Sequence, residues 1–362
     1  MAKIKTINLN NFRNFTSYEL TFDRKLNILF GKNGCGKTNI LEALSLIAKG
    51  RGIRNSNISD LIKRDQNNFL INSILEINKN NYDIKVSSES KNEIFKKKIK
   101  INNDLSKESL EFLDNSISYL TFLPEMERLF QSSPSYRRNF LDRLIFTAKK
   151  DYNRLINKYK KALLERVKIL QSNFVDEDWL NNIEKEISVI GLEIYKQRYT
   201  LLNIINNNIN QLKTDHNFQF NIHLNIKDSF FKSDLNFEKY MFNLQESRFF
   251  DKNYGGTKIG PHRSDIIAKI DDEYEAFSLS TGQQKTVVLM ILLAQCYYLV
   301  DRKNIQPILL FDEIGSHLDS INRQILLEMI NRFELQFFLT GTDKNLFSFV
   351  STNAKFYNIT NI

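Results

Sequence analysis

The feature that most constrains the fold of this chain is an eight-residue segment, Gly31 to Thr38, which reads Gly-Lys-Asn-Gly-Cys-Gly-Lys-Thr. The segment matches the pattern G-x-x-x-x-G-K-[ST]. The largely apolar run 26–30 before it predicts a buried strand, and apolar residues at helical spacing follow it from Ile40 to Ile47. A strand, a glycine-rich loop and a helix in this order place backbone N–H groups around a phosphate. The sequence therefore predicts an α/β fold with a nucleotide site.

Each position of this loop is a candidate contact with ATP, and two side chains have specific expected roles. The Lys37 ammonium is expected to reach the β- and γ-phosphates, and the Thr38 hydroxyl to bind Mg²⁺. A glycine-rich turn without a ligand is the alternative, and the strand and helix that flank the loop argue against it. The predicted nucleotide contacts are Gly31, Lys32, Asn33, Gly34, Cys35, Gly36, Lys37 and Thr38.

A second apolar strand, predicted at 308–311, ends in the acid pair Asp312 and Glu313. A phosphate loop needs a carboxylate on a neighbouring strand to hold the magnesium shell, and Asp312 is placed to contact Mg²⁺, through water in this prediction. Glu313 is the natural group to orient and deprotonate the attacking water. Two adjacent acids after an apolar run are a weak signal taken alone, so this assignment depends on the motifs around them.

The interval from Ser135 to Gly260 contains no proline and little glycine, which permits long helices. Apolar residues recur at spacings of three and four over 152–170 and again over 180–212, and this pattern predicts a helical hairpin. Two alternatives stay open for the hairpin: two helices of a compact core, or a protruding antiparallel coiled coil. Outside this interval, strands are predicted at 3–9, 69–77, 82–87 and 265–270.

Three further segments surround the acid pair. Residues 279–285 read Leu-Ser-Thr-Gly-Gln-Gln-Lys before an apolar helix, Ser316-His317-Leu318-Asp319 follow the acids, and a strand predicted at 336–339 ends in Thr340-Gly341-Thr342. With the phosphate loop, this order resembles the ABC-type ATPases. The resemblance implies that Ser280 and Gly282 bind the γ-phosphate held by the loop of a second copy, so that hydrolysis requires an ATP-dependent homodimer. Thr340 or Thr342 stands where a switch histidine is usual.

Motifs along the whole chain closely resemble those of the RecF family. They are Asn11-Phe12-Arg13-Asn14, Phe122-Leu123-Pro124-Glu125, the segment 133–142 with Arg137 and Arg138, and Gly260-Pro261-His262-Arg263. The resemblance implies an ABC-type P-loop ATPase head with a mixed sheet, residues 1–115 and 255–362, and an inserted, mainly helical arm, residues 116–254. Arg13 is implied as a nucleotide-phosphate contact. Met126, Ser132, Ser264, Glu313 and His317 depart from the usual family residues.

The same resemblance implies slow, DNA-dependent ATP hydrolysis in gap repair and replication restart. The implied partners are duplex and gapped DNA, bound without sequence preference, together with RecR, RecO and the RecA recombinase. The alternatives are a nucleotide-binding subunit of a transporter and an ATP-clamped structural dimer without hydrolysis. In a transporter subunit, far fewer residues separate the phosphate loop from the signature than here, where Lys37 and Ser280 are 280 − 37 = 243 positions apart.

Composition is compatible with a polyanionic partner, because 51 basic and 42 acidic residues leave a net charge of +9. No stretch is long enough to span a membrane, and the first residues lack a secretory pattern, so we expect a cytoplasmic protein without a membrane partner. The two cysteines, Cys35 and Cys296, are expected to be free thiols. The candidate DNA contacts are Arg51, Arg54, Lys63, Arg64, Lys96, Lys97, Lys98, Lys100, Lys158, Lys160, Lys161 and Lys168.

Overall fold

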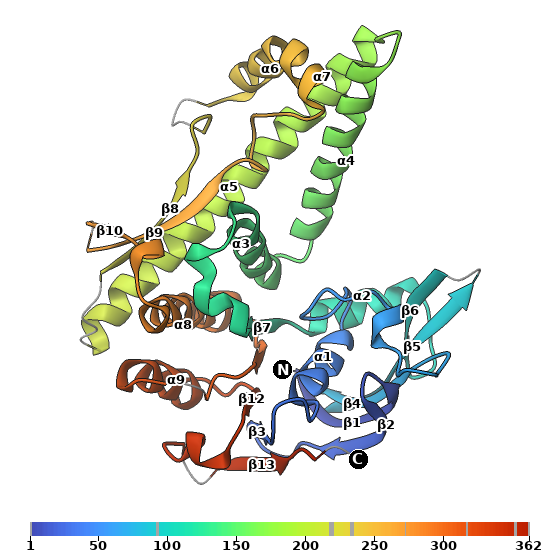
Figure 1. Cartoon of the computed structure of the whole chain (residues 1–362), viewed down its shortest axis with the longest axis vertical. Helices are drawn as coiled ribbons and strands as arrows, with labels where there is room; N and C mark the ends of the chain where they lie inside the picture. The colour runs from blue at the N-terminus through green and yellow to red at the C-terminus, as the bar shows by residue number, and fades with distance from the viewer. Residues whose placement is uncertain are drawn as a thin grey trace. The chain divides into compact units, whose positions relative to one another are not determined.

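Figure 1 shows the computed structural model of the chain, which describes residues 2–91, 94–216, 221–231, 235–271, 273–315, 318–350 and 353–360. The chain divides into two units, Met1–Glu127 with Leu299–Ile362, and Arg128–Tyr298. Residues 255–298, which the sequence assigned to the head, lie in the second unit with the helical hairpin. They do so because the strand at 265–270 pairs with the strand at 222–227 and the helix at 281–297 packs on the hairpin. The boundaries of an inserted arm stay a prediction.

The first unit contains a five-stranded parallel sheet that positions the candidate site. Its strand order is β13 (Ala354–Asn358), β3 (Leu26–Phe30), β12 (Phe337–Gly341), β11 (Ile308–Phe311) and β7 (Tyr119–Phe122). All neighbouring pairs run parallel, and β11 and β12 are buried throughout. Parallel strands end at the same edge of a sheet, so the segments that follow β3, β11 and β12 lie close together.

A second, antiparallel sheet completes this unit, with the order β2 (Phe15–Thr21), β1 (Ala2–Phe12), β4 (Leu70–Ile77), β5 (Asn80–Lys91) and β6 (Ile94–Ile101). The Gln336 side chain joins it to the parallel sheet, because its amide accepts from the Ile4 N–H and donates to the Ile4 carbonyl, both at 2.8 Å. The helices of the unit are α1 (Lys37–Leu46), α2 (Lys107–Ser116) and α9 (Ser320–Arg332). The head therefore contains strands of both orientations, as predicted.

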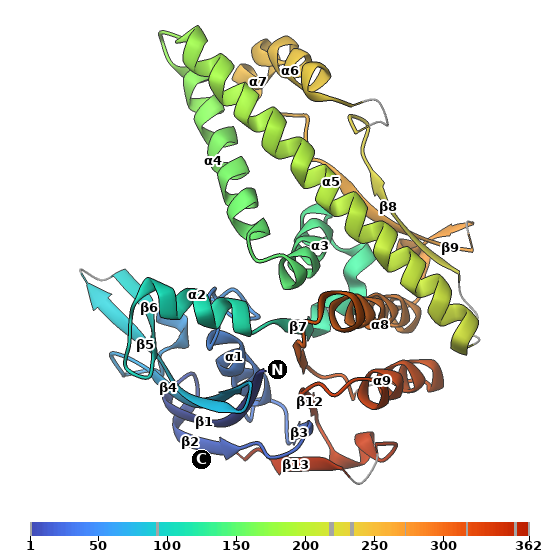
Figure 2. The same ribbon diagram turned by 180° about the vertical axis from the view of Figure 1, so that it is seen from behind.

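The second unit is mainly helical. Its helices are α3 (Pro134–Ala148), α4 (Tyr152–Gln171), α5 (Glu177–His216), α6 (Phe237–Glu246), α7 (Arg248–Tyr254) and α8 (Thr281–Tyr297), and its strands are β8 (Ile222–Lys227), β9 (Asp265–Ile270) and β10 (Tyr274–Glu275). The hairpin of α4 and α5 is confirmed. Because α5 also packs against β8, α6 and α8, the hairpin belongs to a folded core and is not a bare coiled coil (Figure 2).

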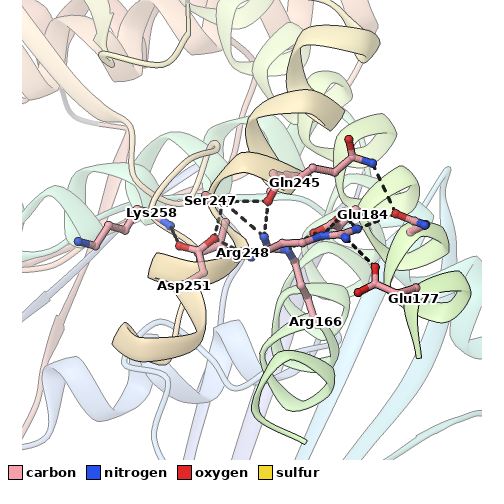
Figure 3. Close-up of polar contacts among 11 residues, drawn as sticks. Arg166, Glu177, Glu184, Gln245, Ser247, Arg248, Asp251 and Lys258 are labelled. Carbon is pink, nitrogen blue, oxygen red and sulfur yellow. Dashed lines mark hydrogen bonds and ion pairs between the residues drawn. The ribbon is translucent and has the colours of Figure 1, made fainter. Parts of the chain in front are cut away.

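Buried ion pairs stabilise the end of the hairpin at which α4 is followed by α5 (Figure 3). The Arg166 side chain on α4 is fully buried, and its guanidinium donates to Glu184 on α5 at 2.9 Å and to Asp251 on α7 at 2.7 Å. Arg248 reaches the same Glu184 carboxylate at 2.6 Å. Buried charges need such partners, because an unpaired one would be strongly destabilising. The network therefore fixes three helices to one another.

The strands predicted at 3–9, 26–30, 69–77, 82–87, 265–270 and 308–311 are all confirmed to within a few residues. The strand predicted at 336–339 begins one residue later and continues to Gly341. Cys35 and Cys296 are both free and buried, as expected. Among the helices that the structure describes, none combines the length and the apolar character needed to cross a membrane.

Candidate nucleotide site

The phosphate loop follows β3 and turns into α1 through glycines with positive φ. Gly31 has φ 152°, Gly34 φ 81° and Gly36 φ 106°. A Cβ on Gly31 would lie 2.4 Å from the Ile359 carbonyl oxygen, and one on Gly36 would lie 2.5 Å from the Phe15 ring. Both the backbone conformation and the space therefore require glycine here. Glycine is needed at these positions because the loop packs tightly against two segments: Gly36 against Phe15 of β2, and Gly31 against Ile359 after β13.

Lys37 folds back over the loop. Its side chain is buried, and its ammonium donates to the carbonyls of Gly31 at 2.7 Å and Lys32 at 3.0 Å. The same nitrogen lies 4.0 Å from the Cys35 sulfur. The positive charge is therefore held against the loop backbone at the N-terminus of α1, where the helix dipole also favours an anion. This placement is compatible with the phosphate contact predicted for Lys37.

The structure brings Thr38 and Asp312 together although 274 positions separate them. The Thr38 hydroxyl donates to the Asp312 carboxylate at 3.0 Å, and the Thr340 hydroxyl donates to the same oxygen at 2.7 Å. The contact forms because β12, which carries Thr340, lies between β3 and β11 in the sheet. A hydroxyl and one carboxylate are hard oxygen donors that suit Mg²⁺, which keeps waters and substrate phosphates as its other ligands. The residues present therefore fit this ion.

Glu313 adopts an unusual backbone conformation, with φ 50°. The left-handed region costs a residue with a side chain roughly 1–2 kcal/mol, so its neighbours must hold it there. The Thr340 hydroxyl does this, because it accepts from the Glu313 N–H at 2.7 Å while it donates to Asp312. Thr340 itself is fully buried. The sequence placed Thr340 at the end of a switch strand but gave no sign that one hydroxyl would join both acids.

Arg13, implied by the resemblance as a phosphate contact, is engaged within the protein. Its guanidinium forms a two-bond pair with the buried Glu42 carboxylate, both at 2.8 Å, and donates to the Asp60 carbonyl at 2.8 Å and the Ser56 hydroxyl at 2.7 Å. Arg13 thereby fastens α1 to the loop at 56–61. Its contact with a phosphate stays a prediction. Glu42 was not predicted from the sequence as the partner of Arg13. An acidic residue within the apolar run of α1 was the signal in the sequence that could have indicated such a buried pair.

Ser280 and Gly282 begin α8 in the second unit. The Ser280 hydroxyl accepts from the Gln283 N–H at 3.3 Å, and the Gln283 side chain accepts from the Ser280 N–H at 3.0 Å, which is a reciprocal helix cap. Both Ser280 and Gly282 are exposed, and a Cβ on Gly282 would meet no atom within 4 Å. The N-terminus of α8 is therefore accessible, while the predicted loop residues Ser316 and His317 lie outside the described residues.

The Gly260 to Arg263 motif packs into the second unit, with Gly260 and Pro261 buried and Arg263 exposed. Gly260 has φ 118°, and a Cβ there would lie 2.2 Å from the Tyr240 hydroxyl and 2.4 Å from that of Tyr159. His262 donates from Nε2 to the Thr257 carbonyl at 2.8 Å, which leaves Nδ1 to accept from Tyr159 at 3.0 Å. Burial lowers the pKa of His262 to about 4, so the ring is neutral near pH 7. The motif therefore has a structural role.

Two other basic side chains are bonded within the protein. Arg137 forms a two-bond pair with Asp265, both bonds at 2.7 Å. Lys97 on β6 donates to the Leu46 and Ala48 carbonyls at 3.1 and 2.7 Å, where α1 ends. A cation there is favoured by the helix dipole. Desolvation by burial lowers the pKa of Lys97 to about 7, although Asp114 opposes the shift.

A parallel sheet with a phosphate loop after β3 and an acid pair after β11 is the arrangement of a P-loop ATPase head. The family model described as "RecF/RecN/SMC N terminal domain" matches residues 3–361. A structure of an Smc head domain with an extended coiled coil from Pyrococcus furiosus shares the fold, with a TM-score of 0.56 at 17% identity, over 100% of this chain and 94% of that chain.

Relatives that match over nearly their full length narrow the class of protein to one family. A Rhizobium rhizogenes protein named "DNA replication and repair protein RecF" is 31% identical over 98% of this chain and 96% of its own. A Rickettsia massiliae protein of the same name is 33% identical over 94% of each chain. A structure described as "the recombination mediator protein RecF-ATP in RecFOR pathway" has a TM-score of 0.82 at 28% identity, over 97% of this chain and 94% of that chain. The chain belongs to the RecF family, and the transporter alternative is not favoured.

Proposed function

We propose that this chain binds ATP and Mg²⁺ at the phosphate loop and uses them to control binding to DNA in recombinational gap repair and replication restart. The observation that carries the proposal is the set of bonds joining Thr38, Asp312, Thr340 and Glu313, because it assembles a phosphate loop and an acid pair into one site. The names of the relatives, which record DNA replication and repair, supply the process.

The chemistry assigned to this site is ATP hydrolysis. Lys37 and the N–H groups of the loop bind the phosphates, and Thr38 and Asp312 hold the metal ion, whose charge stabilises negative charge on the phosphoryl oxygens when it is bound. Glu313 accepts a proton from the attacking water. Its left-handed backbone fixes the direction in which the carboxylate leaves β11. The reaction is proposed to be slow and DNA-dependent, which suits a timing role.

A second copy of the chain is proposed to complete each site. The exposed N-terminus of α8, with Ser280 and Gly282, would supply N–H and hydroxyl donors to the γ-phosphate held by its partner. Support comes from the resemblance to ABC-type ATPases and from the accessibility of this helix end. Hydrolysis would then require the dimer. Sedimentation of the Glu313→Gln variant with ATP tests the idea, and a monomer at every concentration would contradict it.

The proposed partners are DNA, bound without sequence preference, and the proteins RecR, RecO and RecA. They are proposed on family membership and on the description of a RecF structure as part of a RecFOR pathway. The proposed location is the cytoplasm, where these partners act. The alternative function is a structural dimer that is clamped by ATP and does not hydrolyse it. A measurable rate of ATP hydrolysis would favour the proposed function over this alternative.

The test compares two variants on a fluorescent gapped duplex. Lys37→Ala removes the cation of the phosphate loop and should abolish ATP binding together with ATP-dependent DNA retention. Glu313→Gln should bind ATP normally, hydrolyse it at least about a hundredfold more slowly, and retain DNA longer, since loss of a general base costs about 10²–10⁴ in rate.

The controls are Lys107→Ala and Glu19→Gln, which make the same chemical changes at exposed positions of the first unit. Both should behave as wild type. Full ATP-dependent retention in the Lys37→Ala variant, or an unchanged rate in the Glu313→Gln variant, would contradict the proposal.

A further inference from the structure

Helix α4 has a strongly biased charge. It contains six basic residues and one acidic residue, Glu165. One of the basic residues, Arg166, is fully buried in the network with Glu184 and Asp251. The other five are Arg154, Lys158, Lys160, Lys161 and Lys168, and all are exposed. The excess positive charge of α4 therefore lies on its solvent side.

Four of these residues share one face of the helix. Arg154, Lys158, Lys161 and Lys168 follow one another at spacings of four, three and seven, which correspond to whole turns of an α-helix. Glu165, the one acid of α4, lies on the same face between Lys161 and Lys168, and its carboxylate accepts from the Trp179 indole N–H at 3.2 Å. The buried residues, including Tyr159, Ala162 and Ile169, follow a different side of the helix, which packs toward the core. Figure 2 shows α4 with one side against α5 and the other side facing outward. From Arg154 to Lys168 the row covers 14 steps along the helix, or about 21 Å at 1.5 Å per residue.

The lysines of this row differ from two other predicted DNA contacts, which are bonded within the protein. Lys97 is held by the carbonyls of Leu46 and Ala48, and Lys98 pairs with Glu89. By contrast, in the part of the chain that the structure describes, Lys158, Lys160, Lys161 and Lys168 form no ion pair and no side-chain hydrogen bond. Their charges are therefore available to a partner, whereas Arg154 pairs with the exposed Asp151 carboxylate at 3.6 Å.

The chemistry of the row favours a phosphate backbone over a protein surface. Lysine is depleted at the centre of protein interfaces, whereas phosphate backbones attract it. Two large exposed apolar side chains stand beside the row, Leu164 on α4 and Trp179, whose indole N–H donates to Glu165 at 3.2 Å. Over about 21 Å, duplex DNA presents roughly a dozen negative charges. Lysine and arginine contacts to phosphates position a protein without reading sequence.

We propose that the outward face of α4, defined by Arg154, Lys158, Lys161 and Lys168, binds the phosphate backbone of DNA. This inference rests on the proposed function, because it names the surface through which the ATP-controlled DNA binding acts. Each lysine that neutralises a phosphate releases counterions, so it contributes about 0.9 to the slope of log affinity against log salt concentration.

The experiment measures binding of the full chain, with ATP, to a fluorescent 30-base-pair duplex and to the same duplex with a single-stranded gap, over a series of salt concentrations. The test variant is Lys158→Gln/Lys161→Gln/Lys168→Gln. Its control, Lys185→Gln/Lys196→Gln/Lys269→Gln, removes the same charge from exposed positions of α5 and β9. ATP affinity is measured for each protein to confirm an intact phosphate loop.

The inference predicts that the test variant loses about 2.7 from the salt slope, from 0.9 for each of three contacts, while the control stays within one contact of wild type. An unchanged slope in the test variant overturns the inference, even if vesicles of anionic lipid or an acidic protein then bind the row. An equal loss in the control also overturns it, because net charge would then be the cause. Absence of ATP-dependent DNA binding in the wild type would instead refute the proposed function.

Discussion

Replacement of Thr340 by valine tests whether one buried hydroxyl organises the acid pair. Valine has nearly the same shape, so the change removes two hydrogen bonds without opening a cavity. The bond to the Asp312 carboxylate is worth about 1.5–3 kcal/mol, and a partly buried Glu313 N–H left without its acceptor costs about 1 kcal/mol. We therefore expect the free energy of unfolding to fall by about 3 kcal/mol, a large share of the roughly 5–15 kcal/mol typical of a domain.

Thr340→Val should affect ATP hydrolysis more than ATP binding. Lys37 and the loop glycines are untouched, so ATP affinity should change little. The Glu313 backbone loses its anchor, and a misplaced carboxylate should slow ATP hydrolysis by tenfold or more, since each tenfold loss corresponds to about 1.4 kcal/mol. Urea unfolding and phosphate release measure the two effects.

Thr340→Ser is the matched control, because it keeps the hydroxyl and loses only a methyl group. It should hydrolyse ATP at close to the wild-type rate, with a stability loss of about 1 kcal/mol. If the valine variant matched wild type in both stability and turnover, the bridging role of this hydroxyl would be refuted.

Three further predictions concern other parts of the fold. Arg166→Met should cost about 3–5 kcal/mol in urea unfolding, because it leaves the buried Asp251 carboxylate without its cation and leaves Glu184 with Arg248 alone, and a loss below 1 kcal/mol would contradict this account. Gly260→Ala should destabilise the second unit by several kcal/mol, since the added Cβ would lie 2.2 Å from a hydroxyl at a positive φ; wild-type thermal stability would show that the site can relax. The pKa of Lys97 is lowered in the folded chain, so the unfolded state binds more protons above about pH 7. Stability relative to Lys97→Met should rise with pH from 7 to 9, by at most about 1.4 kcal/mol per unit, and parallel pH profiles would be contrary evidence.

The parts of the fold predicted best from sequence are those with strong local patterns. Buried parallel strands form apolar runs, so β3 and β11 were recognised, and the periodic spacing of apolar residues marked both helices of the hairpin. Periodicity could not decide whether the hairpin protrudes. That depends on β8, α6 and α8, which pack on α5 from other parts of the chain.

The candidate site shows the same limit. The loop 31–38 and the acid pair were found because each is a contiguous motif. No local sequence pattern predicts the strand order of the sheet. That order places β12 between β3 and β11 and so brings Thr340 to Asp312. The bond between Arg13 and Glu42 was missed for a related reason, since it depends on how β1 ends beside α1.

By itself, the sequence determined which segments form helices and strands, where a nucleotide could bind, and which family the motifs resemble, because all three depend on residues near one another in the chain. Only the tertiary structure decided which charges are used internally. Arg13, Lys97 and Arg137 bond to groups brought to them by folding, whereas the lysines of α4 face outward. Burial and partners determine the role of a charged side chain, and both are properties of the folded chain.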